Sequence, residues 1–146
     1  MDLKVFEHLA EPRERGAIIT VPDGTEIIEK GAYAGRDDIE KVVIPEGVVE
    51  ISDEAFIFCD QLVSVALPST LKKIGKSAFQ ECVNLSEINF SIELKEIGMA
   101  AFCNCLSLEV PSLPETVKVG DMAFHHTKSK NQGEEINEKW IDCSTN

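Results

Sequence analysis

Aromatic residues that directly follow an alanine recur along this chain at an almost fixed interval. The intervals between successive pairs are 23, 23, 23 and 22 residues. Repetition with a period of roughly 20–50 residues is typical of proteins in which one small structural unit stacks on the next. The period therefore predicts a solenoid of five stacked coils. The five pairs are Ala32-Tyr33, Ala55-Phe56, Ala78-Phe79, Ala101-Phe102 and Ala123-Phe124.

Other residues keep the same register, which makes a chance similarity between the units very improbable. The interval between Pro114 and Phe124 is one residue shorter than its equivalents, so the last unit contains a deletion. Four further columns run through the repeats: Pro22, Pro45, Pro68, Ser91 and Pro114; Ile28, Ile51, Ile74, Ile97 and Val119; Cys59, Cys82 and Cys105; Ile39, Leu62, Leu85 and Leu108.

Each unit has the same predicted order of elements. The alternation in residues 62–67 predicts a short strand that ends at Pro68, because proline has no N–H for a sheet ladder. Residues 71–74 predict a second extended stretch, followed by a bend that Gly75 permits. Residues 77–82 then predict a helical or turn-like segment that returns the chain. The fold class is an α/β repeat solenoid with a parallel β-sheet.

This pattern resembles the BspA-like leucine-rich repeat family over about residues 16–127. The resemblance implies a curved parallel-sheet solenoid and a binding or adhesion role, with no catalytic residues to carry over. Tyr33, Glu29 and Arg36 depart from the pattern in the first unit, as do Ser91 and Thr127 near the other end. The residues that carry it are Leu62-x-x-Val65-x-Leu67-Pro68, Leu71-x-x-Ile74-Gly75 and Ala78-Phe79-x-x-Cys82-x-x-Leu85, repeated as Ile97-Gly98, Ala101-Phe102 and Cys105.

Two flanking segments complete the expected domain organisation. Residues 1–15 are expected to form an N-terminal cap, and residues 128–146 a polar C-terminal tail or cap that includes Trp140. Solenoids need such caps because a terminal strand otherwise exposes unpaired hydrogen-bonding groups. Open solenoid ends also make self-association possible.

The composition excludes some partners. The chain has 146 residues and a formal net charge of −12, so it would be repelled by nucleic-acid phosphates and by anionic membranes. The polar segment at residues 1–8 has no apolar core of a signal peptide, and no uncharged run is long enough to cross a bilayer. We expect a cytoplasmic protein, or a cell-surface or secreted one if the sequence is a fragment.

Cysteine and histidine residues are the candidates for chemistry. The column cysteines are expected to be buried, whereas Cys103 lies off the column and is expected to be more exposed, and Cys143 lies in the tail. An odd number of five cysteines fits a reducing compartment better than a disulfide scaffold. His125-His126 with Cys103 or Cys105 lacks the spacing of a zinc site, and a Cys103–His126 couple has no orienting group. We therefore predict no cofactor, no metal and no enzymatic activity.

The remaining candidates are surfaces. The outward positions of the first strand in each coil should form a small-sided, nearly neutral face, and a basic ladder should run beside it on the second extended stretch. The lysines of the ladder could instead pair with Glu50, Glu96 and other carboxylates. The face comprises Lys41, Val43, Ser64, Ala66, Glu87, Asn89 and Ser112, and the ladder Lys72, Lys73, Lys95 and Lys118.

The sequence thus favours a non-enzymatic protein–protein interaction module. The alternative is a cell-surface adhesin, or a fragment of one, that binds a host protein or a glycan. Because fold-level analogy supports both readings, neither names the partner.

Overall fold

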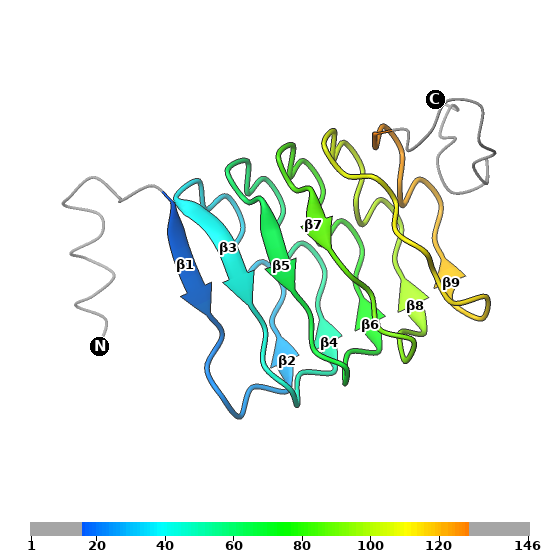
Figure 1. The fold of residues 1–146 in the computed structure, drawn as a ribbon, viewed down its shortest axis with the longest axis horizontal. Helices are drawn as coiled ribbons and strands as arrows, with labels where there is room; N and C mark the ends of the chain where they lie inside the picture. Colours follow the sequence, from blue (N-terminus) through cyan, green and yellow to red (C-terminus); the bar gives the residue numbers. More distant parts are fainter. Residues whose placement is uncertain (1–15, 129–146) are drawn as a thin grey trace.

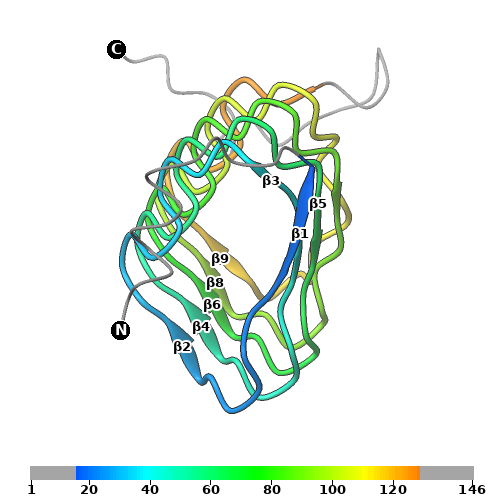
Figure 2. The same ribbon diagram turned by 90° about the vertical axis from the view of Figure 1, so that its left-hand side faces the viewer.

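A computed structural model describes residues 16–128 of the chain, which form a stack of coils with three sides (Figures 1 and 2). Two sides are parallel β-sheets, here called sheet A and sheet B, and the third is a layer of turns. Sheet A has the strand order β1-β3-β5-β7, and sheet B has the order β2-β4-β6-β8-β9. The strands are β1 (Ala17–Thr20), β2 (Ile27–Ile28), β3 (Ile39–Val43), β4 (Glu50–Ile51), β5 (Ser64–Ala66), β6 (Lys73–Ile74), β7 (Glu87–Ile88), β8 (Glu96–Ile97) and β9 (Lys118–Val119).

The sequence period becomes the register of both sheets. Val42 pairs with Val65 and Val65 with Ile88 in sheet A, and the isoleucine column pairs in the same way through sheet B. Each coil therefore places identical columns of apolar side chains on the next, and these columns meet in the core between the sheets and the turns. The expected fold class, a repeat solenoid with parallel β-sheets, is confirmed.

The third side consists of turns. Ten residues in this layer have φ between 57° and 75°, which an α-helix of L-amino acids cannot accommodate. The sequence allowed a helical or a turn-like segment here, and the structure has the turns. The segments are residues 30–35, 53–58, 76–81, 99–104 and 121–126, and the residues with positive φ are Gly31, Glu54, Ser77, Ala100 and Met122 at one place and Gly35, Phe58, Glu81, Asn104 and His126 at the other.

The positive φ values have a physical cause in the hydrogen bonds between coils. Along each turn, the N–H groups point alternately to the neighbouring coil and back to their own coil. The N–H of Phe56 donates to the carbonyl of Ala78 at 2.8 Å, whereas the N–H of Ala55 donates to Ser52 at 3.2 Å. The turn layer is thus a third hydrogen-bonded ladder, and it offsets the strain of the left-handed residues.

An aromatic column fills the core beneath the turns. Neighbouring rings of the column lie nearly parallel, with centroids 5.0–5.3 Å apart and interplanar angles of 1–6°. Phe90 adds an edge-on contact to Phe102 at 5.6 Å. Offset parallel rings at this spacing stabilise one another beyond their buried area. The stack consists of Tyr33, Phe56, Phe79, Phe102 and Phe124.

The glycine column has a different role from the one predicted. Gly75, Gly98 and Gly120 do not have positive φ, so the bend that follows β6, β8 and β9 does not depend on a left-handed glycine. A Cβ added at Gly98 would instead lie 2.7 Å from the backbone nitrogen of Lys76 and 2.8 Å from the carbonyl carbon of Gly75. In the third, fourth and fifth coils, glycine leaves room for the backbone of the preceding coil, which lies against this place.

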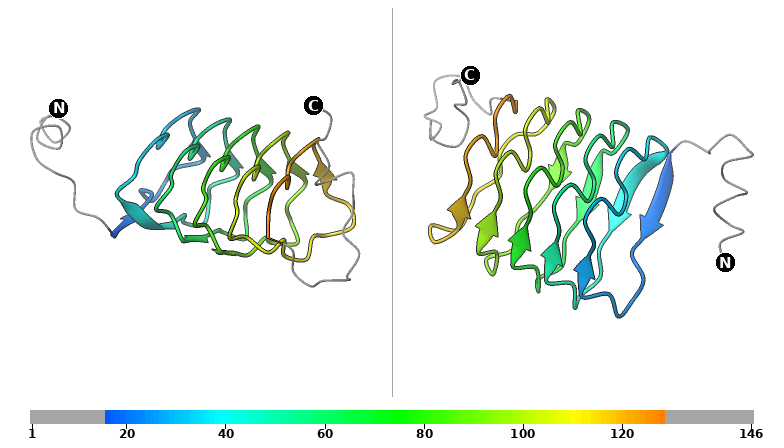
Figure 3. Two further views of the ribbon diagram at one scale, coloured as in Figure 1. Left: turned by 90° about the horizontal axis from the view of Figure 1, so that it is seen from above. Right: turned by 180° about the vertical axis from the view of Figure 1, so that it is seen from behind.

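Sheet A ends one coil before sheet B does (Figure 3). The fifth coil has Pro111 where the other coils have the inward Val42, Val65 and Ile88. Proline has no N–H to give to a ladder, so the strand expected in this coil does not form. Beyond it, Lys128 begins to pair again, with a bridge to Glu109 and an N–H donated to the carbonyl of Leu108 at 2.9 Å.

Candidate binding faces

The outer face of sheet A carries the residues predicted for binding. Lys41 lies beside Ser64 and Ser64 beside Glu87, while Val43 lies beside Ala66. These side chains point outward because the residues between them, Val42, Val65 and Ile88, are buried in the core. Of the predicted face, Val43 and Ser64 are half-buried and the others are exposed: Lys41, Ala66, Glu87, Asn89 and Ser112.

Two members of the predicted face lie outside the strands. Asn89 directly follows β7, and Ser112 follows Pro111 in the coil without a sheet A strand. The face also includes a residue that the sequence analysis missed, because Ile18 on β1 is in register with Lys41 and is 66% exposed. Its position 23 residues before Lys41 was the signal that could have found it. The face is therefore more apolar at its β1 end than predicted.

The predicted basic ladder divides into two columns in the structure. Lys72 and Lys95 share one column, and Nζ of Lys72 lies 3.9 Å from Oε1 of Glu93. Lys73 and Lys118 occupy the neighbouring column, in which Lys73 pairs in register with Glu50 and Glu96 and Lys118 pairs with Glu96. A continuous basic surface is thus interrupted by carboxylates.

A hydrogen-bonded row crosses the end of the turn layer. Nδ2 of Asn104 donates to Oε2 of Glu81 at 2.6 Å, and Oδ1 of Asn104 lies 2.9 Å from Nδ1 of His126. With its amide group oriented by Glu81, Asn104 accepts from His126, so Nδ1 of His126 carries a proton. The ring of His125 stacks on that of His126 at 3.7 Å. This row joins three successive coils at their surface.

The histidine pair gives little support to metal or nucleophilic chemistry. Within residues 16–128, no group of three or more His, Cys, Asp or Glu side chains is arranged to hold a metal ion. Cys103 is 8% exposed, compared with 0% for the column cysteines. It is more exposed than they are, as expected, but it is still a buried side chain.

The column cysteines have a specific structural role. Their thiols donate to the carbonyl oxygen of the aromatic residue one coil earlier, as Cys82 does to Phe56 at 3.2 Å and Cys105 to Phe79 at 3.1 Å. Burial raises the pKa of Cys82 and of Cys105, whereas side-chain hydrogen bonding with Cys82 lowers the pKa of Cys59. These buried thiols are expected to stay protonated where the pKa is raised, so Cys82 and Cys105 are poor nucleophiles.

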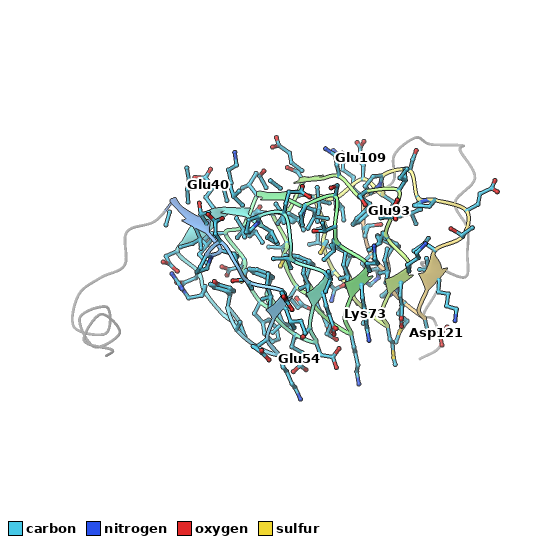
Figure 4. All side chains as sticks on the ribbon, turned by 90° about the horizontal axis from the view of Figure 1, so that it is seen from below. Glu40, Glu54, Lys73, Glu93, Glu109 and Asp121 are labelled. Carbon is cyan, nitrogen blue, oxygen red and sulfur yellow. The ribbon has the colours of Figure 1, made fainter. Side chains whose placement is uncertain are left out.

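Charge is distributed unequally along the solenoid. Residues 16–61 contain 11 acidic and 3 basic side chains, a difference of −8, whereas residues 62–128 contain 7 acidic and 6 basic ones, a difference of −1. Figure 4 shows Glu54, Lys73 and Asp121 on one side of the solenoid and Glu40, Glu93 and Glu109 on the other. The first two coils therefore carry most of the negative charge of the described residues.

These features define a parallel β-solenoid scaffold with two open sheet faces. The sequence matches the family described as BspA type leucine rich repeat region, in six copies over residues 17–131. The chain belongs to this family. Such leucine-rich repeat proteins are scaffolds that typically bind proteins and are generally not enzymes.

Solved structures of bacterial proteins are similar to this one. A T. pallidum leucine rich repeat protein is 33% identical with a TM-score of 0.71, and the match covers 75% of this chain and 54% of that one. A leucine rich cell surface protein from Faecalibacterium prausnitzii is 30% identical with a TM-score of 0.69, over 79% of this chain and 36% of that one. The pneumococcal vaccine antigen PcpA, 23% identical with a TM-score of 0.58 over 82% of this chain and 40% of that one, shares the fold.

The chain therefore spans 54% of the length of the T. pallidum protein and 36% of that of the F. prausnitzii protein. No curated protein matches the sequence. Among residues 16–128, no helix is long and apolar enough to cross a membrane.

Proposed function

We propose that this chain is a non-enzymatic protein-interaction module that binds a protein partner through the outer face of sheet A. The observation that carries the proposal is the in-register exposure of its side chains on a rigid ladder of strands. A face fixed by backbone hydrogen bonds loses little conformational freedom when a partner binds. The membership of the family supports a binding role of this kind.

The chemistry of the face suits a protein better than a nucleic acid or a membrane. Its side chains are small or of mixed charge, with Lys41 and Glu87 on either side of Ser64 and with the apolar Ile18 and Val43 near the β1 end. A surface without a dominant sign of charge does not attract phosphate groups. Small side chains let the backbone of a partner approach the sheet closely.

The test is a pull-down from lysate and culture medium of the source cells with the full chain as bait. Ala66→Arg with Asn89→Arg adds two large charged side chains to the face, so we expect the captured partner to be lost. The matched control is Ile92→Arg with Leu106→Arg, which adds the same charge at exposed places away from sheet A. Circular dichroism must first show that both variants fold.

A partner that is retained equally by wild type and by the sheet A variant would contradict this location of the site. Loss in the sheet A variant alone would support it. Loss in both variants would show that added charge, rather than the face, determines binding, and would also contradict the proposal.

A second candidate is a cell-surface protein, or part of an adhesin, that binds a host protein or a glycan. The observation that favours it is the similarity to a leucine rich cell surface protein that is 30% identical. Labelling of intact source cells with a membrane-impermeant reagent distinguishes this location from a cytoplasmic one. Labelled protein supports the surface candidate, and label that enters only after lysis contradicts it.

A further inference from the structure

The outer face of sheet B carries one charged side chain on each of its strands β4, β6, β8 and β9, and the signs alternate, whereas β2 places the apolar Ile27 in the same column. The row consists of Glu50, Lys73, Glu96 and Lys118, which are neighbours in parallel register. Glu96 and Lys118 are exposed, and Glu50 and Lys73 are half-buried. Within one molecule, this order places opposite charges side by side. The order has a second consequence. When the row is taken in the reverse direction, each position carries the opposite charge.

We propose that the outer face of sheet B binds a second copy of this chain in an antiparallel arrangement. The two-fold axis of this dimer is parallel to the strands and lies between β6 and β8. It places the two rows face to face, with the row of the second copy running in the opposite direction. Glu50 then faces Lys118 of the second copy, and Lys73 faces Glu96 of the second copy. A two-fold contact uses the same patch on both molecules, so each of these pairs occurs twice.

The residues beside the row favour the same arrangement. The third coil presents Lys72, Lys73 and Lys76 near this face, and the fourth coil presents Glu93, Lys95 and Glu96. The axis places the third coil of one copy against the fourth coil of the other, so that three positive charges face a net charge of −1. Like charges also meet, Lys72 with Lys95 and Asp53 with Asp121, so the attraction is a balance of opposing contacts.

The alternative face-to-face arrangement is electrostatically unfavourable. If the two copies were stacked in the same direction, Glu50 would face Glu50 and Lys73 would face Lys73. The acidic first two coils, with their difference of −8, would also lie together. The antiparallel arrangement instead places these coils at opposite ends of the dimer.

The size of the face sets the strength of the contact. The four strands that carry the charges, at a spacing of about 4.8 Å, give a row on the order of 15 Å long. This is small for a stable protein–protein interface, and exposed charge pairs contribute little each. We therefore infer a weak, rapidly exchanging dimer that dissociates as salt screens the charges.

Sedimentation velocity of the full chain over a concentration series tests the proposal. We expect dimer at low salt (about 20 mM) and a dissociation constant at least about tenfold higher at about 500 mM salt. Lys73→Glu should weaken the low-salt dimer by at least about tenfold, because two pairs become repulsive. Lys41→Glu makes the same change of charge on sheet A and should leave the dimer intact.

The double variant Lys73→Glu with Glu96→Lys separates contacts between molecules from contacts within one. The charges along its row are acidic, acidic, basic and basic. In the antiparallel dimer each acidic side chain still faces a basic side chain of the second copy, so the dimer should return. Inside each molecule it creates two like-charge neighbours, so the melting temperature should stay below that of the wild type.

Three results would overturn the proposal: a wild-type protein that stays monomeric at low salt at every concentration, a dimer that Lys73→Glu leaves unchanged, or a double variant that stays monomeric. Because the partner-binding proposal concerns sheet A, the pull-down result and the sedimentation result are independent of each other.

Discussion

Phe79 lies in the middle of the aromatic stack, between Phe56 and Phe102, and none of its surface is exposed. The rings on both sides are fixed by the turn ladder, in which the N–H of Phe79 itself donates to Ala101 at 2.7 Å. Neighbouring coils therefore cannot collapse easily into a space left at this position. The cost of a core cavity depends on how well its surroundings can close it.

We expect Phe79→Ala to lower the free energy of unfolding by about 3–5 kcal/mol, a large part of the stability of a small domain. Urea unfolding followed by circular dichroism measures this change. Phe58→Ala is the control, because Phe58 is one coil earlier and is 56% exposed. The control should change the free energy of unfolding by less than about 1 kcal/mol. Equal unfolding curves for Phe79→Ala and wild type would contradict the prediction.

The individual coil is the element that repeats, and side chains tie each coil to the next at several corners. The hydroxyl of Ser69 donates to Oε1 of Glu46 at 2.7 Å, and Nδ2 of Asn84 donates to the carbonyl of Asp60 at 2.7 Å. The first coil has Arg36 in the cysteine column, and its guanidinium makes two hydrogen bonds to Asp38 instead of a thiol–carbonyl bond. Each coil thus depends on its neighbours for packing and for hydrogen bonds.

Close stacking of coils predicts that Gly98→Ala is destabilising, although alanine is otherwise the better residue for a chain with negative φ. The new Cβ would meet backbone atoms of the preceding coil, so we expect a loss of about 1–3 kcal/mol. Thermal or urea unfolding measures it. Ser52→Ala is the matched control, because Ser52 holds the equivalent place in the second coil and already has a Cβ. A stabilised Gly98→Ala variant would show that the coils can separate at this place.

At the scale of the whole molecule, the two sheets differ in chemistry. Sheet A presents mostly small side chains together with the oppositely charged Lys41 and Glu87, and we propose that it binds a protein partner. Sheet B presents the alternating row, and we assign it to a second copy of the chain. Because the sheets lie on different sides of the solenoid (Figure 2), a dimer through sheet B would leave both copies of the sheet A face accessible. The chain would then be a bivalent binder, with the avidity that two linked sites provide.

The sequence by itself determined the repeat and the composition of the core. Columns such as Ile51, Ile74 and Ile97 can be assigned without coordinates, because side chains that recur at the period of the coil must stack on one another. The outward positions of sheet A followed from the same register and from the alternation of the strand. The binding role of these positions is still a prediction.

Only the tertiary structure decided which contacts form between coils. The turn layer is not helical because alternate N–H groups bond to the next coil, and a Cβ at Gly98 would meet the backbone of the preceding coil. The sequence left open whether the lysines form a basic ladder or pair with Glu50 and Glu96, and the register places Lys73 between these two carboxylates. The chain order gives the period of a solenoid, but the distance and orientation between successive coils depend on backbone packing and hydrogen bonds that no single repeat contains.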